Sequence, residues 1–408
     1  MTSVLTFLYR ILYRIYHFAL KLVTKVVPFP RPSLYQGKEA LNDLVANIEK
    51  NKLQKLLLVT DDMIKSLGLH ENLLKALEAN GITIEIYSNV QPNPSIANVE
   101  EGVKVYLLAQ CQGVICLGGG SVMDCAKLIA VRIARPNKTI PELKGLFRVL
   151  RRLPPIYAIP TTAGTGSETT IVAVVSDPAN KQKYALTDIS LTPKAAVLLP
   201  ELTYGLPPQI TSVTGMDALT HAIEAFVGIT GTKFTNQRAM DASRLIFCNL
   251  LGAYQDGKNK QYRRDMLLAS FYAGEAFTRA SVGYVHAIAH SLGGLYGTAH
   301  GLANAVILPK VLRWYGAAVE HKLATLADYC QITADSNTPS SKALAFIEAI
   351  EKLNEQMDIA TGIADLKTED IPMLAKKALD EAHPEYPVPK FMNQEDCQNL
   401  LSSLLLEK

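Results

Sequence analysis

The sequence predicts an α/β domain built on a parallel sheet, followed by an all-helical domain. Helical and strand patterns alternate in the part of the chain before Gly118, where a glycine-rich turn follows the last strand pattern. After about Leu206 the strand patterns disappear and long helical patterns take their place. Alternation of this kind is typical of βαβ units, whose helices cover both faces of a parallel sheet. We therefore expect a basic amphipathic helix at 1–27, an α/β domain at 28–205 and a helical domain at 206–408.

The first 27 residues predict a basic amphipathic helix. Polar side chains recur once per turn of a 3.6-residue helix, at Arg10, Arg14, His17, Lys21 and Lys25. Charges at every turn argue against a membrane span, and no small-residue cleavage site follows them. Two alternatives remain open. The helix lies on an anionic membrane surface, or it docks on its own chain or on a neighbouring subunit.

The remaining elements are predicted from hydrophobic periodicity and turn residues. Short apolar runs predict buried strands at 55–60, 82–87 and 114–117. Helical patterns beside these strands cover 40–51, 63–80 and 99–111. In the second half, helices are predicted at 211–228, 236–254, 262–279, 285–292, 303–314 and 341–356.

The composition describes a globular protein. Hydrophobic residues make up 48% of the 408 residues and charged residues 19%, which excludes a disordered chain. The formal net charge of +3 is too small to indicate a nucleic-acid partner. None of the six cysteines forms a CxxC pair, so we expect reduced core thiols in a reducing, cytoplasmic compartment.

A glycine turn and a hydroxyl-rich loop predict a nucleotide site in the α/β domain. Gly118-Gly119-Gly120-Ser121 joins a strand to a helix, and backbone N–H groups at such a helix start can bind a pyrophosphate. The turn is not the GxGxxG fingerprint. The loop at 159–168 adds threonine hydroxyls and glycines. Asp61 follows an early strand, where a carboxylate suits a ribose hydroxyl and favours NAD over NADP, although a solvated turn residue is the alternative.

Histidines gather between residues 217 and 300, which hold four of the eight in the chain. Asp217 and His221 are four residues apart, as are His286 and His290, so each pair lies on one helix face. His300 follows soon after. A single pair of this kind is more often a buried polar pair than a set of ligands. The whole cluster, among small and apolar neighbours, predicts a divalent metal site.

With these motifs in place, the chain resembles the iron-containing (group III) alcohol dehydrogenase family. The resemblance runs from about Leu34 to the C-terminus, and it is most specific at 214–224 and 285–301. It implies a dehydroquinate synthase-like architecture, with an N-terminal Rossmann-like dinucleotide-binding domain and a C-terminal metal-binding domain. The amphipathic N-terminal helix lies outside the usual family core.

The resemblance also implies individual roles. The implied metal ligands are Asp217, His221, His286 and His300, and His290 is the implied proton relay beside the nicotinamide. The implied NAD-binding residues are Asp61, Asn93, Gly119, Gly120, Ser121, Asp124, Thr161, Thr162, Thr165 and Lys183. The implied metal is Fe(II), although three imidazoles and a carboxylate also accept zinc.

The expected function is reversible hydride transfer between a primary alcohol or its aldehyde and NAD(H). One alternative within the superfamily is a polyol or glycerol dehydrogenase, or a maleylacetate reductase-like enzyme. An alternative from another class is a membrane-associated protein that binds metal and nucleotide without turnover. We expect a cytoplasmic homodimer with no nucleic-acid partner, with peripheral membrane contact through 1–27 as the open question.

Overall fold

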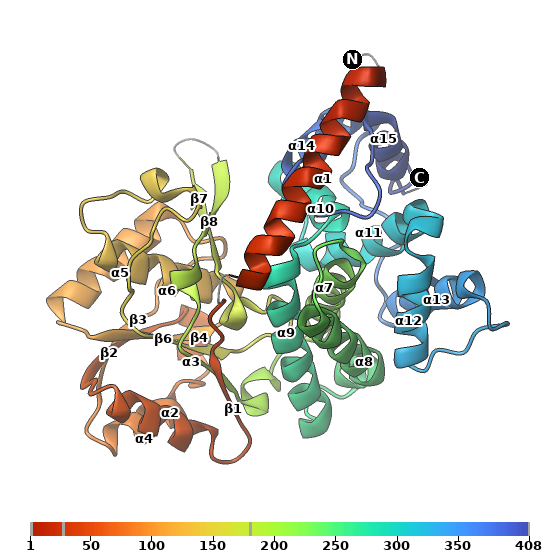
Figure 1. Cartoon of the computed structure of the whole chain (residues 1–408). Coiled ribbons are helices and arrows are strands. Elements are labelled where there is room, and N and C mark those ends of the chain that lie inside the picture. The colour runs from red at the N-terminus through yellow and green to blue at the C-terminus, as the bar shows by residue number, and fades with distance from the viewer. Residues whose placement is uncertain (1–2, 27–28, 179–181, 407–408) are drawn as a thin grey trace. The chain divides into compact units, whose positions relative to one another are not determined.

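The structure is a computed structural model that describes residues 3–26, 29–178 and 182–406, with the side chains of the first stretch described from residue 8 to residue 22. The chain forms two compact units. One is Pro30–Gly205, and the other combines Met1–Phe29 with Leu206–Lys408. Figure 1 shows the helices and strands of both units.

The first unit is built on a six-stranded sheet in the order β1-β9-β6-β4-β2-β3. Every neighbouring pair is parallel, which confirms the predicted sheet. Its strands are β1 (Ser33–Gln36), β2 (Lys55–Val59), β3 (Thr83–Tyr87), β4 (Gly113–Gly118), β6 (Ile156–Pro160) and β9 (Ala195–Leu198). A smaller sheet joins β5 (Gly145–Leu146), β8 (Gln182–Thr187) and β7 (Val172–Asp177).

Helices cover both faces of the large sheet. They are α2 (Ala40–Lys50), α3 (Asp62–Ser66), α4 (Glu71–Glu78), α5 (Ile96–Leu108) and α6 (Gly120–Ala134). The pleat explains how the sheet contributes to two cores. Leu57 and Val59 of β2 pack in one apolar cluster with residues of α5 and α6. Leu56 and Leu58 point the other way, into a cluster with residues of α2 and α4.

Two local predictions in this unit were wrong. The continuous helix predicted at 63–80 is divided into α3 and α4, because Gly68 adopts φ +66° between them and ends the first helix. Strands β1, β5, β6, β7, β8 and β9 were not predicted. They are two to six residues long, and prolines beside β6 made that segment resemble a turn.

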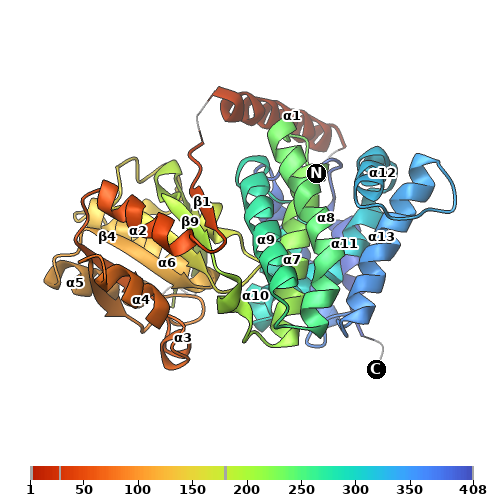
Figure 2. The same cartoon turned by 90° about the horizontal axis from the view of Figure 1, so that it is seen from below.

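The second unit is helical, as predicted. Its helices after residue 206 are α7 (Pro208–Val227), α8 (Lys233–Gln255), α9 (Lys260–Ala280), α10 (Tyr284–Tyr296), α11 (His300–Tyr315), α12 (Glu320–Tyr329), α13 (Pro339–Gln356), α14 (Ile371–Ala382) and α15 (Gln394–Ser402). In Figure 2, α7, α8 and α9 lie side by side. A Cβ at Gly215 would lie 2.2 Å from Leu250 Cδ1, so glycine allows α7 to approach α8 this closely. The sequence had not predicted α12, α14 or α15.

Short 3₁₀ helices complete the two units. They are Pro141–Leu143, Ser167–Thr169, Ile189–Leu191, Pro200–Thr203, Gly316–Ala318 and Thr368–Asp370. All six cysteines are free thiols, five of them buried, whereas Cys248 is exposed rather than in the core.

The N-terminal helix α1 (Ser3–Val26) packs on the second unit through its basic stripe. Arg14, His17 and Lys21 form hydrogen bonds with backbone carbonyl groups of that unit. The acceptors are Val388 and Pro389 for Arg14, Pro384 for His17 and Ile229 for Lys21, at 2.7–3.2 Å. Helix α1 thus docks on its own chain, which is one of the two alternatives from the sequence. Among the described residues, no helix is long and apolar enough to span a membrane.

Candidate functional site

The predicted nucleotide residues lie at one edge of the parallel sheet. Strand β2 pairs with β3 on one side and with β4 on the other, so the chain changes direction across the sheet at this point. In open α/β sheets, ligands bind outside the carboxyl ends of the strands where the order reverses. Asp61 follows β2, Gly119 follows β4 and Thr161 follows β6. The fold therefore brings these three segments to the edge where a dinucleotide is expected.

The glycine turn contacts the hydroxyl-rich loop. A Cβ at Gly120 would lie 2.9 Å from Thr165 Cγ2, and a Cβ at Gly119 would lie 3.4 Å from Thr162 Oγ1. Gly119 is the N-cap of α6 and provides no side-chain cap for its first amides. A helix start of this kind can offer its N–H groups to a phosphate. The backbone of the turn and the threonine hydroxyls thus form a cradle that fits a pyrophosphate.

Three further predicted residues meet beside this cradle. The backbone N–H of Asn93 donates to Ser121 Oγ at 3.2 Å, and Lys183 Nζ donates to Asn93 Oδ1 at 2.7 Å. Burial lowers the pKa of Lys183, and the nearby carboxylate of Asp124 opposes that shift. These contacts place a cationic side chain close to the start of α6, where an anion is also favoured by the helix dipole.

The two carboxylates predicted for the nucleotide site, Asp61 and Asp124, form hydrogen bonds within the chain at this edge of the sheet. Asp61 Oδ1 accepts a hydrogen bond from the Ile64 N–H at 2.8 Å and caps α3. Asp124 accepts from Ser167 Oγ at 3.1 Å and from the Val174 N–H at 3.2 Å. Burial raises the pKa of Asp124 to about 6. Both residues therefore have structural partners in addition to the cofactor roles that the resemblance implies.

Lys127 was not among the predicted site residues, yet it organises the hydroxyl-rich loop. Its ammonium is fully buried and donates to the backbone and hydroxyl oxygens of Ser167 and Thr170 and to the carbonyl of Val172, at 2.7–3.2 Å. Burial lowers its pKa to about 8. The sequence could have indicated this role, because Lys127 stands within the apolar stretch of a predicted helix and a buried cation needs several hydrogen-bond partners.

The predicted metal residues come from three helices of the second unit. Asp217 and His221 lie on α7, His286 on α10 and His300 at the start of α11. Asp217, His221 and His286 are buried, and each offers a ligand atom within 4.8 Å of the others. Nε2 of His286 lies 3.8 Å from Asp217 Oδ1, and Nε2 of His300 lies 3.4 Å from the same oxygen. His300 belongs to the group through Asp217, and its side chain remains 40% exposed.

Glu224 was missed by the sequence reasoning, and it fixes the orientation of His286. Its carboxylate accepts hydrogen bonds from the N–H groups of Gly283 and Val285 and lies 2.6 Å from His286 Nδ1. Burial lowers the pKa of His286 well below its usual value, so the ring is neutral. A neutral ring that donates from Nδ1 to Glu224 presents the Nε2 lone pair to the cluster, as metal-bound histidines do. The sequence could have indicated the role of Glu224, because this residue follows Asp217 by seven positions and therefore lies on the same helix face.

Asn304 is the second residue that was missed. It is fully buried, and its Nδ2 donates to Asp217 Oδ1 at 2.7 Å. The same nitrogen lies 3.3 Å from His286 Nε2 and 3.2 Å from His300 Nε2. It therefore touches three of the predicted ligands. In the sequence, Asn304 follows His300 by four residues, which is the spacing of neighbours on one helix face.

His290 lies outside the buried cluster. Its ring stacks on His300, with centroids 5.1 Å apart, and its side chain is 43% exposed. Its Nδ1 lies 2.6 Å from Glu381 Oε1, which also accepts a hydrogen bond from Tyr386 Oη. The contact with Glu381 on α14 joins residues 91 positions apart, so no local pattern indicated it.

Glycines allow the helices of the cluster to approach one another. A Cβ at Gly301 would lie 2.2 Å from the Val213 carbonyl oxygen on α7, and a Cβ at Gly283 would lie 2.8 Å from Glu224 Oε1. Larger residues at these positions would separate α11 from α7 or displace Glu224. The glycines therefore place His300 and His286 beside Asp217.

The donor set fits a divalent transition metal. With metal–ligand bonds of about 2.1 Å, tetrahedral ligand atoms lie about 3.4 Å apart. The separations of 3.4 Å and 3.8 Å from Asp217 Oδ1 are close to that spacing. Three imidazoles and one carboxylate suit iron or zinc, and Glu224 provides the outer hydrogen bond that such sites contain.

Comparisons with known proteins match both halves of the chain. A model of the iron-containing alcohol dehydrogenase family matches residues 31–200, and a model of the C-terminal region of the Fe-containing alcohol dehydrogenase family matches residues 211–405. Alcohol dehydrogenase 4 of Saccharomyces cerevisiae is 39% identical over 86% of this chain and 91% of that protein. NAD-dependent methanol dehydrogenase of Bacillus methanolicus is 36% identical over 86% of this chain and 93% of its own length.

Solved structures show the same likeness. The crystal structure of a 1,3-propanediol oxidoreductase superposes with a TM-score of 0.89 at 34% identity. The match covers 93% of this chain and 99% of that chain.

Proposed function

Because the chain belongs to the iron-containing alcohol dehydrogenase family, we propose that it interconverts a primary alcohol and its aldehyde with NAD(H) as the hydride carrier. The observation that carries this proposal is the buried group of Asp217, His221 and His286, in which Glu224 directs the Nε2 of His286 toward the carboxylate. The glycine turn and threonine loop support the use of a dinucleotide. The name of the methanol dehydrogenase relative supports NAD as that dinucleotide.

The proposed chemistry divides between the bound groups and the residues of the chain. When bound, the metal supplies Lewis acidity at the substrate oxygen, and the nicotinamide carries the hydride. Asp217, His221, His286 and His300 hold the metal. His290 transfers the hydroxyl proton toward solvent, which its partly exposed ring allows. Its Nδ1 is held by a carboxylate, so Nε2 is the nitrogen that would exchange the proton.

The proposed substrates are short aliphatic primary alcohols and diols. The names of the matched relatives cover methanol and 1,3-propanediol as well as an unspecified alcohol. Iron is the proposed metal because the family is named for it. The homodimer and the cytoplasmic location expected from the sequence stay predictions.

The test is NADH formation by protein stripped of metal and reloaded anaerobically with Fe(II). The substrates would be methanol, ethanol, 1,3-propanediol and longer primary alcohols, with glycerol as the polyol comparison. We expect turnover with at least one primary alcohol, and turnover that requires the metal. Preference for glycerol would favour the polyol alternative. Absence of turnover with any alcohol, despite bound metal and NAD, would overturn the proposal.

The metal itself is tested by reloading the same stripped protein with zinc. A higher rate with Fe(II) than with Zn(II) at equal occupancy is expected. Equal or higher activity with zinc would contradict the assignment of iron but leave the dehydrogenase activity intact.

A further inference from the structure

Helix α1 exposes an apolar stripe on the side that faces away from the protein. Six large side chains recur every three or four residues, and each is between 42% and 63% exposed. They are Leu8, Ile11, Leu12, Ile15, Phe18 and Leu22. At 100° per residue they cover an arc of roughly 120°. With Tyr9, α1 holds seven of the nineteen large apolar side chains that are exposed among the described residues.

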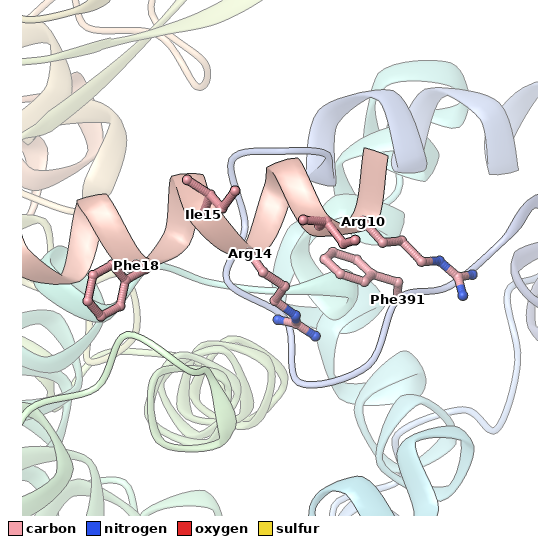
Figure 3. A pocket seen from close by; sticks show the side chains of 6 residues that line it. Arg10, Arg14, Ile15, Phe18 and Phe391 are labelled. Carbon is pink, nitrogen blue, oxygen red and sulfur yellow. The ribbon is translucent and has the colours of Figure 1, made fainter. Parts of the chain in front are cut away.

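This arrangement inverts the usual orientation of an amphipathic surface helix, which buries its apolar face. In α1 it is the basic stripe that faces the protein, through Arg14, His17 and Lys21. His17 is 1% exposed, and Arg14 both donates to two carbonyl groups and lies 4.2 Å from the centroid of the Phe391 ring. Figure 3 shows Phe391 against α1, between Arg10 and Arg14. Hydrogen bonds from the basic residues therefore fix the helix with its apolar side outward.

The apolar stripe also borders a shallow groove. The groove has a volume of about 550 Å³ and is lined by Arg10, Ile11, Arg14, Ile15, Phe18 and Phe391. Its lining is apolar apart from the two guanidinium groups. In Figure 2, α1 lies along the edge of the helical unit to which it belongs. Contiguous exposed apolar surface of this kind marks a site of protein or membrane contact.

The charge on the helix identifies the partner. Helix α1 contains arginine, lysine and histidine but no aspartate or glutamate, and the first acidic residue of the chain is Glu39. Arg10 is exposed beside the apolar stripe. Two copies of α1 face to face would bring together segments that carry only positive charge, which is unfavourable. An anionic lipid surface satisfies both features, because it accepts apolar side chains and attracts the guanidinium of Arg10 beside them.

We propose that α1 anchors this protein to an anionic membrane surface by inserting its apolar stripe among the lipids, while its basic stripe holds the helix to the protein. The interaction is peripheral. It differs from the arrangement expected from the sequence, in which the basic residues would face the headgroups. Among the basic side chains that the structure describes, Arg10 at the border of the stripe takes that position. The proposal concerns binding and does not depend on the dehydrogenase activity.

The test is flotation of the full-length protein with vesicles of equal parts phosphatidylglycerol and phosphatidylcholine, and with vesicles of phosphatidylcholine alone. We expect the protein to float with the anionic vesicles. The double variant Ile15→Glu/Phe18→Glu changes two side chains that are 59% and 63% exposed, so it should fold normally. We expect it to bind anionic vesicles at least roughly tenfold more weakly, because two charges would enter the apolar layer.

The matched control is Leu107→Glu/Leu108→Glu, which changes two exposed leucines of α5 in the other unit. We expect this variant to bind vesicles like the unmodified protein, and we expect both double variants to keep the activity measured in solution. Equal binding by the α1 variant and the control would overturn the proposal. Equal binding of the unmodified protein to neutral and anionic vesicles would overturn the proposal that the surface is anionic. If the unmodified protein bound no vesicles but formed a dimer that only the α1 variant lost, α1 would be a protein interface instead.

Discussion

The nucleotide edge and the metal centre are built in different ways. The nucleotide edge consists mainly of backbone groups at the ends of β2, β4 and β6, with glycines that allow close approach. The metal centre consists of side chains from α7, α10 and α11, which are oriented by buried partners such as Glu224 and Asn304. A site built from backbone follows from local sequence and sheet topology. A site built from side chains depends on long-range contacts, so substitutions should affect the two sites separately.

The largest effect is expected from removal of a ligand. In His286→Ala, we expect loss of bound metal and a decrease in kcat of roughly 10³-fold or more, because Lewis acid catalysis requires the full donor set. Affinity for NAD should be unchanged. Metal analysis, steady-state kinetics and calorimetric titration with NAD measure these three quantities.

The matched control for that prediction is His321→Ala, which removes an exposed histidine from α12. It should retain metal and activity. If His286→Ala kept its metal, or lost NAD affinity together with it, the two sites would not be separable in the way described.

The converse variant is Gly120→Val. Its side chain would collide with Thr165, because a Cβ alone would lie 2.9 Å from Cγ2 of that residue. We expect KM for NAD to rise by roughly 100-fold while the metal content stays the same, since the clash is at the start of the helix that cradles the phosphate. The control is Gly205→Val, where a Cβ would meet no atom within 4 Å. An unchanged KM in Gly120→Val would remove the glycine turn from the cofactor site.

An intermediate effect is expected from Glu224→Gln. The amide nitrogen of glutamine would face one of the three N–H groups that the carboxylate now accepts from, so His286 would lose its fixed orientation. We expect metal affinity to fall by about 10–100-fold, as is typical when the outer hydrogen bond of a metal-bound histidine is lost. Competition with a chelator measures this. Wild-type metal affinity in the variant would show that Glu224 does not orient the ligand.

The smallest effect is expected from Glu381→Ala. Glu381 contacts His290 and none of the four predicted ligands, so metal content and NAD affinity should stay the same. We expect kcat to fall by roughly tenfold, within the range of general acid–base contributions. In a His290→Ala background the same substitution should have almost no further effect. A full additional decrease in that background would indicate that Glu381 acts independently of His290.

The sequence predicted those parts of the fold that local patterns determine. The strands at 55–60, 82–87 and 114–117 correspond to β2, β3 and β4. The helix break at Gly68 was not foreseen, because the helical pattern of apolar residues continues across it. Strands such as β9 are short and gain their stability from neighbours far away in the sequence, as in its pairing with β1 and β6.

In the candidate site, too, the sequence predicted the features that local patterns determine and missed the contacts between distant residues. Spacing of four residues along a helix identified Asp217 with His221, and the glycine turn identified Gly119 and Gly120. The partners that orient these groups were not identified. The contact between Glu381 and His290 spans 91 positions, and the hydrogen bond between Asn304 and Asp217 spans 87. Only packing of α7, α10, α11 and α14 determines such contacts.

Helix α1 shows a further limit. Its period predicted two stripes, and that prediction was sound, but the period alone does not say which stripe faces the protein. The general preference for burying apolar residues would place the basic stripe outside. The basic stripe faces the protein instead, because Arg14 and His17 form hydrogen bonds with carbonyl groups of a distant segment, at Val388, Pro389 and Pro384.

The account depends most directly on whether one metal ion in the Asp217–His221–His286–His300 group makes the enzyme active. The measurement is an anaerobic titration of metal-stripped protein with Fe(II), with NADH formation from a primary alcohol followed at each addition. We predict that activity rises from near zero and reaches its plateau at one equivalent of metal per chain. Full activity of the metal-stripped protein, or activity that does not change with the amount of Fe(II) added, would contradict the account.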